Sequence, residues 1–399
     1  MMMSRKKILF VAMSESVHSV RWIKQLDSSE YEVFLYPSHD INLFHDGLDW
    51  VSICFPLYSF KKICTKIYLG KVFNFIYSLY KIFAQKFFPN YYQFRLFIYI
   101  KLLKPDIIHS LETQGAGYLV DSVKNNYFKH KKFPKWWHTN WGSDIYLFGR
   151  LDNHYSRIKQ LLSNIDYYSA ECERDIVLAK DYGFTGLCLP VYPNTGGFNL
   201  SQILDLRNNS LPTSERKYIM LKGYQGWAGR ALFGLAALRS IGNLLDGYTI
   251  IVYSNPDSDD IKISCELLSK DLGVTVIVLP KSTHNEILYW QSQSRISIGL
   301  SISDGISTSL LEAMALGAFP IQSDSSAANE WIEDNYTGLL VSAEDCVDIA
   351  DSIKLALLDD QLVDNANYRN WDVISNRAEY NRCKELSLES YNKIINKNI

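Results

Sequence analysis

The sequence has no long uncharged apolar stretch. Nowhere do about 18 apolar residues follow one another without a charge, which excludes a membrane-spanning helix. The apolar run at residues 8–13 ends at Ser14 and Glu15. This run is too short for the core of a signal peptide, so we expect a first β-strand there.

Cysteine pairs and metal-binding patterns are also missing, and the net charge is small. The seven cysteines are scattered, odd in number and without C-x-x-C spacing, which is typical of reduced cytosolic thiols and excludes a disulfide framework. Asp257-Ser-Asp259 follows Pro256 and is typical of a loop rather than a metal clamp. A net charge of −2 gives no basic field for nucleic acid. We therefore expect a cytoplasmic protein without a metal, a cofactor or a nucleic-acid partner.

Acidic residues are absent from Trp50 to Pro105, where nine Lys and Arg alternate with many aromatic residues. Apolar residues recur there at spacings of three and four, the pattern of amphipathic basic helices. Such a face binds anionic lipid, so we predict that residues 57–104 hold the protein on a membrane surface. Two alternatives are ordinary helices with inward aromatics and a single-stranded nucleic-acid track, the latter disfavoured because no nucleic-acid-binding fold pattern accompanies it.

Strand and helix patterns alternate along the rest of the chain in two series. The first series runs from residue 8 to residue 192, and the second begins with the strand pattern at 218–223. Between them, residues 194–214 are polar and contain Pro212, so we place the domain boundary there. Thr283 and Glu286 have the spacing of a capping box at the start of a helix. The pattern predicts two α/β domains.

The stretch from residue 296 to residue 322 predicts a strand, a loop, a short helix and another strand. Gly305 breaks the first strand, hydroxyl residues can cap the helix, and Gly317 ends it. Loops at the carboxyl ends of parallel strands bind ligands, and a helix N-terminus suits phosphate. Asp304 and Glu312 frame this loop and can accept hydrogen bonds from sugar hydroxyls. The alternative is that Asp304 caps the helix and Glu312 is solvated.

The run 304–315, followed by 319–323 and 329–332, resembles the donor-site signature of family-four retaining glycosyltransferases with the GT-B fold. The resemblance implies that Asp304 holds sugar hydroxyls and that Glu312 holds the ribose. Asp304 stands where the family has glutamate, one methylene longer. The groups that the resemblance implies for the diphosphate lie between the two acids: Gly305, Ser307, Thr308 and Ser309.

Two cations bracket the glycine-rich loop that follows the strand at 218–223. Family members hold the diphosphate with an Arg and a Lys from this loop, which by resemblance implies Lys222 and Arg230 here, although their order and spacing differ. Such a pair with a helix N-terminus suits a diphosphate leaving group. The alternative is that both are ordinary surface residues.

Further candidates follow strands of the first domain. The resemblance implies that His18 or Arg21 contacts substrate, that His109 and Glu112 line the cleft, and that Asp144 faces the donor sugar or acceptor. The alternatives are surface positions at a helix start for His18 and Arg21, and a helix N-cap for Asp144.

The resemblance implies a GT-B fold of two Rossmann-like domains. We expect an acceptor domain at 1–194, a donor domain at 215–372 and a helical tail at 373–399 that crosses back to the first domain. The implied activity is retaining, metal-independent hexosyl transfer from a nucleotide sugar to a glycan acceptor. We expect this acceptor to be lipid-linked, in cell-surface polysaccharide or lipopolysaccharide biosynthesis at the cytoplasmic face of the inner membrane. The alternatives are a sugar-nucleotide epimerase, a glycosyl phosphorylase and a non-catalytic binding module.

Overall fold

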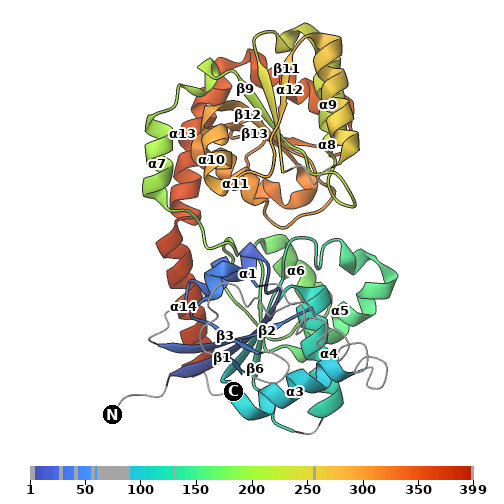
Figure 1. Cartoon of the computed structure of the whole chain (residues 1–399), viewed down its shortest axis with the longest axis vertical. Coiled ribbons are helices and arrows are strands. Elements are labelled where there is room, and N and C mark those ends of the chain that lie inside the picture. Colours follow the sequence, from blue (N-terminus) through green and yellow to red (C-terminus); the bar gives the residue numbers. More distant parts are fainter. Residues whose placement is uncertain are drawn as a thin grey trace, which may run out of the picture. The chain divides into compact units, whose positions relative to one another are not determined.

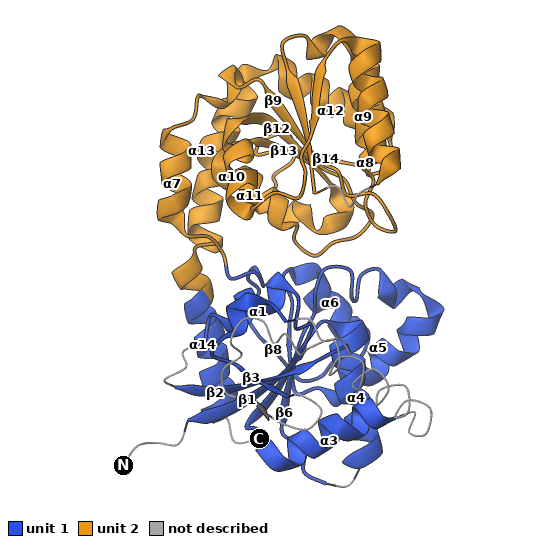
Figure 2. Cartoon of the chain, viewed as in Figure 1, with its two compact units in different colours: residues 1–196, 384–399 blue, residues 197–383 orange. Residues whose placement is uncertain are grey.

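The computed structural model divides the chain into two compact units (Figure 2). Unit 1 comprises residues 1–196 and 384–399, and unit 2 comprises residues 197–383. The residues that the structure describes are 5–26, 30–39, 44–54, 59–60, 90–129, 131–254 and 258–396.

Unit 1 is built on one sheet with the strand order β4-β3-β2-β1-β5-β6-β7-β8. Neighbouring strands are parallel except for β3 and β4, which pair antiparallel at one edge. The central strands are buried, in keeping with their almost uninterrupted apolar sequences. The bounds are β1 Lys6–Ala12, β2 Tyr31–Pro37, β3 Ser52–Cys54, β4 Ser59–Phe60, β5 Ile107–Leu111, β6 Lys135–Thr139, β7 Tyr167–Ser169 and β8 Leu187–Cys188.

The helices of unit 1 connect these parallel strands and cover the sheet (Figure 1). A π-helical turn, η2 (Thr113–Gly117), leads directly from the end of β5 into α4. The helices are α1 Val17–Ile23, α3 Tyr91–Leu103, α4 Tyr118–Tyr127, α5 Asp152–Asn164, α6 Glu173–Asp181 and α14 Tyr380–Asn396, with short 3₁₀ turns at Asp46–Leu48 and Phe148–Arg150.

Unit 2 has a fully parallel sheet with the order β11-β10-β9-β12-β13-β14. Alternate residues of β9 and β10 face opposite sides: Ile219 packs into the main core, while Met220 packs towards Trp290 of α10. The strands are β9 Tyr218–Lys222, β10 Thr249–Tyr253, β11 Thr275–Val278, β12 Ser294–Gly299, β13 Phe319–Ser323 and β14 Leu339–Val341.

The helices of unit 2 lie on both faces of its sheet (Figure 1). Among them, α11 follows β12, and the expected stop at Gly317 is confirmed by its left-handed φ of 78°. The capping box of Thr283 and Glu286 at the start of α10 is also confirmed. The helices are α7 Leu200–Asn208, α8 Ala231–Ser240, α9 Asp259–Leu272, α10 His284–Gln293, α11 Thr308–Leu316, α12 Cys346–Leu358 and α13 Asp360–Arg377, with 3₁₀ turns at Thr213–Glu215, Gly242–Leu245, Asp324–Ser326 and Ala328–Glu330.

Two expected boundaries differ from the structure. The polar stretch that we placed between domains forms α7 within unit 2, because Arg207 donates a 2.8 Å hydrogen bond to the Ala315 carbonyl and another to Asn367. The tail expected from residue 373 begins later, since α13 belongs to unit 2 and unit 1 resumes at residue 384.

The structure describes little of the basic aromatic segment at 57–104. Residues 57–58 and 61–89 lie outside the described residues, and the remainder includes α3. This helix exposes Phe94 and Leu102, of which Leu102 is 72% exposed. No described helix is both long and apolar enough to cross a membrane.

The last helix of the chain completes the core of unit 1. Tyr391 of α14 is fully buried, and its ring centroid lies 4.7 Å from that of Trp137. Its hydroxyl accepts a hydrogen bond from Trp22 Nε1 at 3.2 Å and lies 2.7 Å from His109 Nδ1. Lys135 Nζ also donates to the Ile394 carbonyl at 2.6 Å. Unit 1 therefore depends on residues from both ends of the sequence.

We expect Tyr391→Ala to lower the unfolding free energy of unit 1 by about 4 kcal/mol, because it leaves a cavity among aromatic rings. Urea unfolding followed by near-ultraviolet circular dichroism would measure this change. Lys393→Ala, at an exposed position of the same helix, is the control and should change stability by less than about 0.5 kcal/mol. Equal effects of the two substitutions would contradict the proposed contribution of Tyr391.

Candidate functional site

The loops that follow β9 and β12 lie against each other in unit 2. These strands are neighbours in the sheet. The Arg230 amide donates to the Leu300 carbonyl at 3.0 Å, and the Ile302 amide donates to the Ala228 carbonyl at 2.9 Å. The glycine-rich loop is thereby fixed beside the loop that contains Asp304. The two stretches that sequence reasoning treated separately thus form one surface.

A lysine and two hydroxyls meet at the N-terminus of α11. Ser307 is the N-cap residue, and its Oγ lies 2.9 Å from Ser309 Oγ and 3.5 Å from Lys222 Nζ. Thr308 begins the helix, and Gly305 is buried in the preceding loop. The first amides of a helix have no partner within the helix, and the helix dipole favours negative charge there. An ammonium group beside such a terminus provides a site for phosphate.

Glu312 lies inside unit 2, and only one of its two carboxylate oxygens is hydrogen-bonded to a described residue. Its side chain is 7% exposed, and its Oε1 lies 2.7 Å from His284 Nε2. Within the described part of the chain, Oε2 has no hydrogen-bond partner. A carboxylate oxygen that no protein donor occupies can accept hydrogen bonds from the hydroxyls of a ligand. Glu312 is therefore not the solvated helix residue of the alternative interpretation.

Asp304 and Arg230 are both engaged with their surroundings. Asp304 Oδ1 accepts a hydrogen bond from the Gly305 amide at 2.9 Å, and burial together with the Asp304 carboxylate raises the pKa of Tyr224. Arg230 Nε pairs with Glu344 Oε1 at 2.5 Å, and Arg230 Nη1 donates to the Gly229 carbonyl at 2.9 Å. Arg230 thus supports its own loop in this structure, in addition to any contact with a ligand.

In unit 1, two buried acids lie at the ends of β5 and β6. Glu112 has a φ of 74° and accepts hydrogen bonds from the Gly115 amide at 2.8 Å and from the Ala116 amide. Asp144 Oδ2 accepts from the Thr113 amide at 2.8 Å and from the Trp141 amide at 2.9 Å. Asp144 therefore joins two loops rather than capping an α-helix.

Burial dominates the electrostatics of this acid pair. It raises the pKa of Glu112 and raises the pKa of Asp144 well above its usual value, and the negative charge of Glu112 raises the pKa of Asp144 further. Hydrogen bonds from backbone amides oppose both shifts. Each carboxyl thus retains its proton to a higher pH than it would in the unfolded chain.

His39 belongs to this cluster, and sequence reasoning missed it. A Cβ atom on Gly115 would lie 2.5 Å from Glu112 Oε1 and 2.9 Å from His39 Cε1, so a larger residue there would force one of these side chains to move. Ser38 Oγ lies 3.0 Å from His39 Nδ1. The available signal was its position, two residues beyond the end of β2.

The other predicted residues of unit 1 occupy different environments. His18 is exposed on α1, and its ring centroid lies 5.8 Å from that of Trp141. Arg21 is partly buried on the same helix, which begins at Val17. His109 does not fit its expected place in a cleft, because its imidazole is fully buried between Tyr391 and Thr139.

Two family models match the chain. Residues 7–170 match "Glycosyl transferase 4-like", and residues 254–371 match "Glycosyl transferases group 1". The chain is a glycosyltransferase. A search of curated proteins finds no match.

Solved structures show which fold this glycosyltransferase has. Sucrose-phosphate synthase from Thermosynechococcus elongatus is 14% identical with a TM-score of 0.68, and the match covers 98% of this chain and 99% of that one. Anabaena HepE in complex with UDP-glucose is 15% identical with a TM-score of 0.67, covering 97% and 99%. A glycosyltransferase from Rickettsia africae ESF-5 is 14% identical with a TM-score of 0.63, covering 99% and 100%. At these identities the likeness shows the fold, which is GT-B, as expected.

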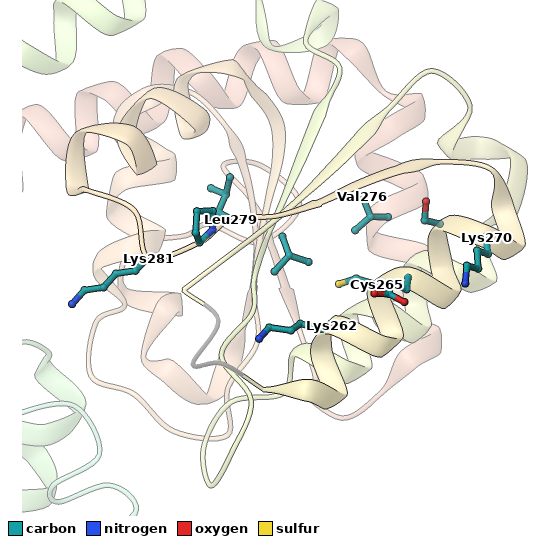
Figure 3. A pocket seen from close by; sticks show the side chains of 10 residues that line it. Lys262, Cys265, Lys270, Val276, Leu279 and Lys281 are labelled. Carbon is teal, nitrogen blue, oxygen red and sulfur yellow. The ribbon is translucent and has the colours of Figure 1, made fainter.

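A cavity of about 640 Å³ lies elsewhere in unit 2 of the glycosyltransferase, between α9 and the edge strand β11 (Figure 3). Val276 and Cys265 line it, with Lys262, Lys270 and Lys281 around it. None of the predicted donor residues lines this cavity. The described residues contain no group of three or more His, Cys, Asp or Glu arranged to hold a metal ion.

We expect Asp144→Asn to stabilise unit 1 by an amount that grows as the pH rises from about 4. A carboxyl whose pKa is raised by folding contributes most below its unfolded value, and this contribution is lost as the pH rises through the folded value. Asparagine cannot ionise, yet its carbonyl oxygen can still accept from Thr113 and Trp141.

Urea unfolding of both proteins across a pH series would measure the difference in stability. Because the buried histidines are the same in both proteins, their titration largely cancels in this difference. A stability difference that does not change with pH would contradict the prediction. Asp152→Asn, at an exposed position, is the matched control.

Proposed function

We propose that the chain transfers a sugar from a nucleotide-sugar donor to a glycan acceptor. The observation that carries this proposal is the surface at α11, where Lys222 approaches Ser307 and Glu312 keeps one carboxylate oxygen without a partner among the described residues. These groups suit the two chemical features of a nucleoside diphosphate, its anionic phosphates and its ribose hydroxyls. The UDP-glucose in the structurally similar HepE complex is consistent with this class of donor.

Different residues of unit 2 bind the sugar, the diphosphate and the ribose of the donor. Asp304 accepts hydrogen bonds from hydroxyls of the sugar, and Glu312 accepts from the ribose. The diphosphate lies at the N-terminus of α11, near Lys222, with Gly305, Ser307, Thr308 and Ser309 supplying amides and hydroxyls. Arg230 adds positive charge once its pairing with Glu344 is loosened.

The reaction breaks the bond between the anomeric carbon and the diphosphate oxygen and forms a bond to an acceptor oxygen. Lys222 and the helix N-terminus stabilise the negative charge that develops on the diphosphate, without a metal ion. We propose front-face substitution with retention, in which the acceptor hydroxyl gives its proton to the leaving phosphate oxygen. The remaining phosphate charge is held by the same cation.

Unit 1 binds the acceptor in this proposal. His18 is exposed on α1 and is the group that touches substrate, with Arg21 on the same helix. Glu112 and Asp144 act differently, because their oxygens already accept hydrogen bonds from loop amides. We assign them as positioning residues that fix the loops after β5 and β6.

The donor assignment predicts that Glu312→Ala and Asp304→Asn each lower kcat/KM by about 100-fold or more, because each removes hydrogen bonds to a charged group. Release of nucleoside diphosphate from a panel of nucleotide sugars, with acceptor present, would measure this. Glu266→Ala, on the exposed face of α9, is the control and should leave turnover unchanged. Unchanged turnover in both site variants would reject the site. An epimerised donor formed without acceptor would reject transfer itself.

We further propose that the acceptor is lipid-linked and that residues 57–104 hold the enzyme on the cytoplasmic face of the inner membrane, in cell-surface polysaccharide biosynthesis. The support is the absence of acidic residues in this segment together with its many Lys and aromatic residues. In its described part, α3 exposes Phe94 and Leu102. Lys61, Lys62 and Lys66 lie outside the described residues.

Changing Lys61, Lys62 and Lys66 to Glu should lower the affinity for anionic liposomes by at least about tenfold, because each basic residue near the surface contributes about 1 kcal/mol. Sedimentation with the liposomes would measure this affinity. The matched control changes Lys262, Lys270 and Lys281 of unit 2 to Glu, which alters the net charge equally. Binding that is insensitive to salt, or equally weakened in both triple variants, would contradict an electrostatic contact through this segment.

A further inference from the structure

His284 occupies a fixed position at the beginning of α10. The preceding residue, Thr283, is the N-cap, and its capping box with Glu286 holds the first turn of the helix. The imidazole projects far enough to place Nε2 2.7 Å from Glu312 Oε1 on α11. His284 therefore connects the beginning of α10 with the middle of α11, through two residues that are 28 positions apart in the sequence.

The two partners differ in exposure. The His284 side chain is 43% exposed, whereas that of Glu312 is 7% exposed. A half-exposed ion pair adds little to stability, so the pairing does not explain why a carboxylate is kept inside unit 2. For Nε2 to bond to the carboxylate it must carry the proton, and it then restricts rotation of the carboxyl group. The second oxygen, Oε2, is thus held in one direction without a partner among the described residues.

We propose that His284 is a positioning residue that makes the donor site selective for the ribose of a nucleoside diphosphate. It holds Oε1 of Glu312, so that Oε2 is aimed to accept a hydrogen bond from a ribose hydroxyl. Loss of the imidazole lets the carboxylate rotate, and the site then loses its preference for ribose while its phosphate contacts persist. This inference rests on the proposed function of the same site.

Phosphate binding at the start of α11 can be compared with ribose binding at Glu312 in the same protein. Lys222 and Ser307 meet at the start of α11, whereas Glu312 lies further along the same helix and His284 on a different one. A probe that carries phosphate without ribose therefore tests only the contacts made by Lys222 and Ser307 at the start of α11. A change confined to ribose recognition separates positioning of Glu312 from general damage to α11.

The experiment measures dissociation constants by isothermal titration calorimetry. The probes are whichever of UDP, GDP, ADP and CDP binds the unmodified protein best, its 2′-deoxy analogue, and inorganic pyrophosphate. We expect His284→Ala to weaken ribonucleotide binding by about tenfold, to bring the ratio between ribose and deoxyribose affinities close to one, and to leave pyrophosphate affinity within about twofold.

Two further variants make the result specific. His284→Gln keeps an N–H donor that can reach the carboxylate and should restore much of the ribose preference. Asn285→Ala is the matched control, because Asn285 is the next residue of α10 and bonds to Gln202 rather than to Glu312. It should bind all three probes as the unmodified protein does.

The outcomes separate this inference from the function on which it rests. If the unmodified protein binds no nucleoside diphosphate, both fail. If it binds one and His284→Ala keeps the same preference for ribose, only the role of His284 is overturned. If His284→Ala weakens pyrophosphate as much as the ribonucleotide, His284 supports the fold of the site, and the selective role is again overturned.

Discussion

Every parallel strand in this protein ends at the same edge of its sheet, and the loops that follow must satisfy backbone amides that no strand or helix bonds. Acidic side chains meet this requirement in unit 1. Glu112 accepts from two amides of the turn after β5, and Asp144 accepts from amides in the loops after β5 and β6. Because an unpaired buried amide is costly, these bonds decide the loop conformations and hence the surface that can meet a ligand.

At the carboxyl ends of the strands of unit 2, the loops that follow β9 and β12 rely less on hydrogen bonds from backbone amides to acidic side chains. Its two loops pair with each other through backbone groups at Ala228, Arg230, Leu300 and Ile302. In the same unit, Glu312 has a carboxylate oxygen that no described residue uses. This contrast separates acids that hold the protein together from an acid that can hold a substrate, although both kinds are buried. Burial alone would not distinguish them.

Local sequence patterns were enough to predict the alternating strands, the stop of α11 at Gly317 and the capping box at Thr283, because each depends on neighbouring residues. The loop that contains Asp304 was found for the same reason. Sequence could not predict the partners of these residues. The pairing of His284 with Glu312, the meeting of His39 with Gly115, and the burial of His109 behind Tyr391 all depend on which strands and helices become neighbours. The start of α7 was missed because its anchor, Arg207, bonds to groups more than a hundred residues away.

The return of α14 to unit 1 has a consequence for synthesis on the ribosome. Residues 197–383 are contiguous and leave the exit tunnel before the last helix does, so unit 2 can fold while unit 1 still lacks Tyr391. Until then, Trp22 and Trp137 lack an aromatic neighbour that covers them in the finished protein. In the nascent chain, Trp22 and Trp137 therefore remain uncovered by Tyr391 until α14 has been synthesised.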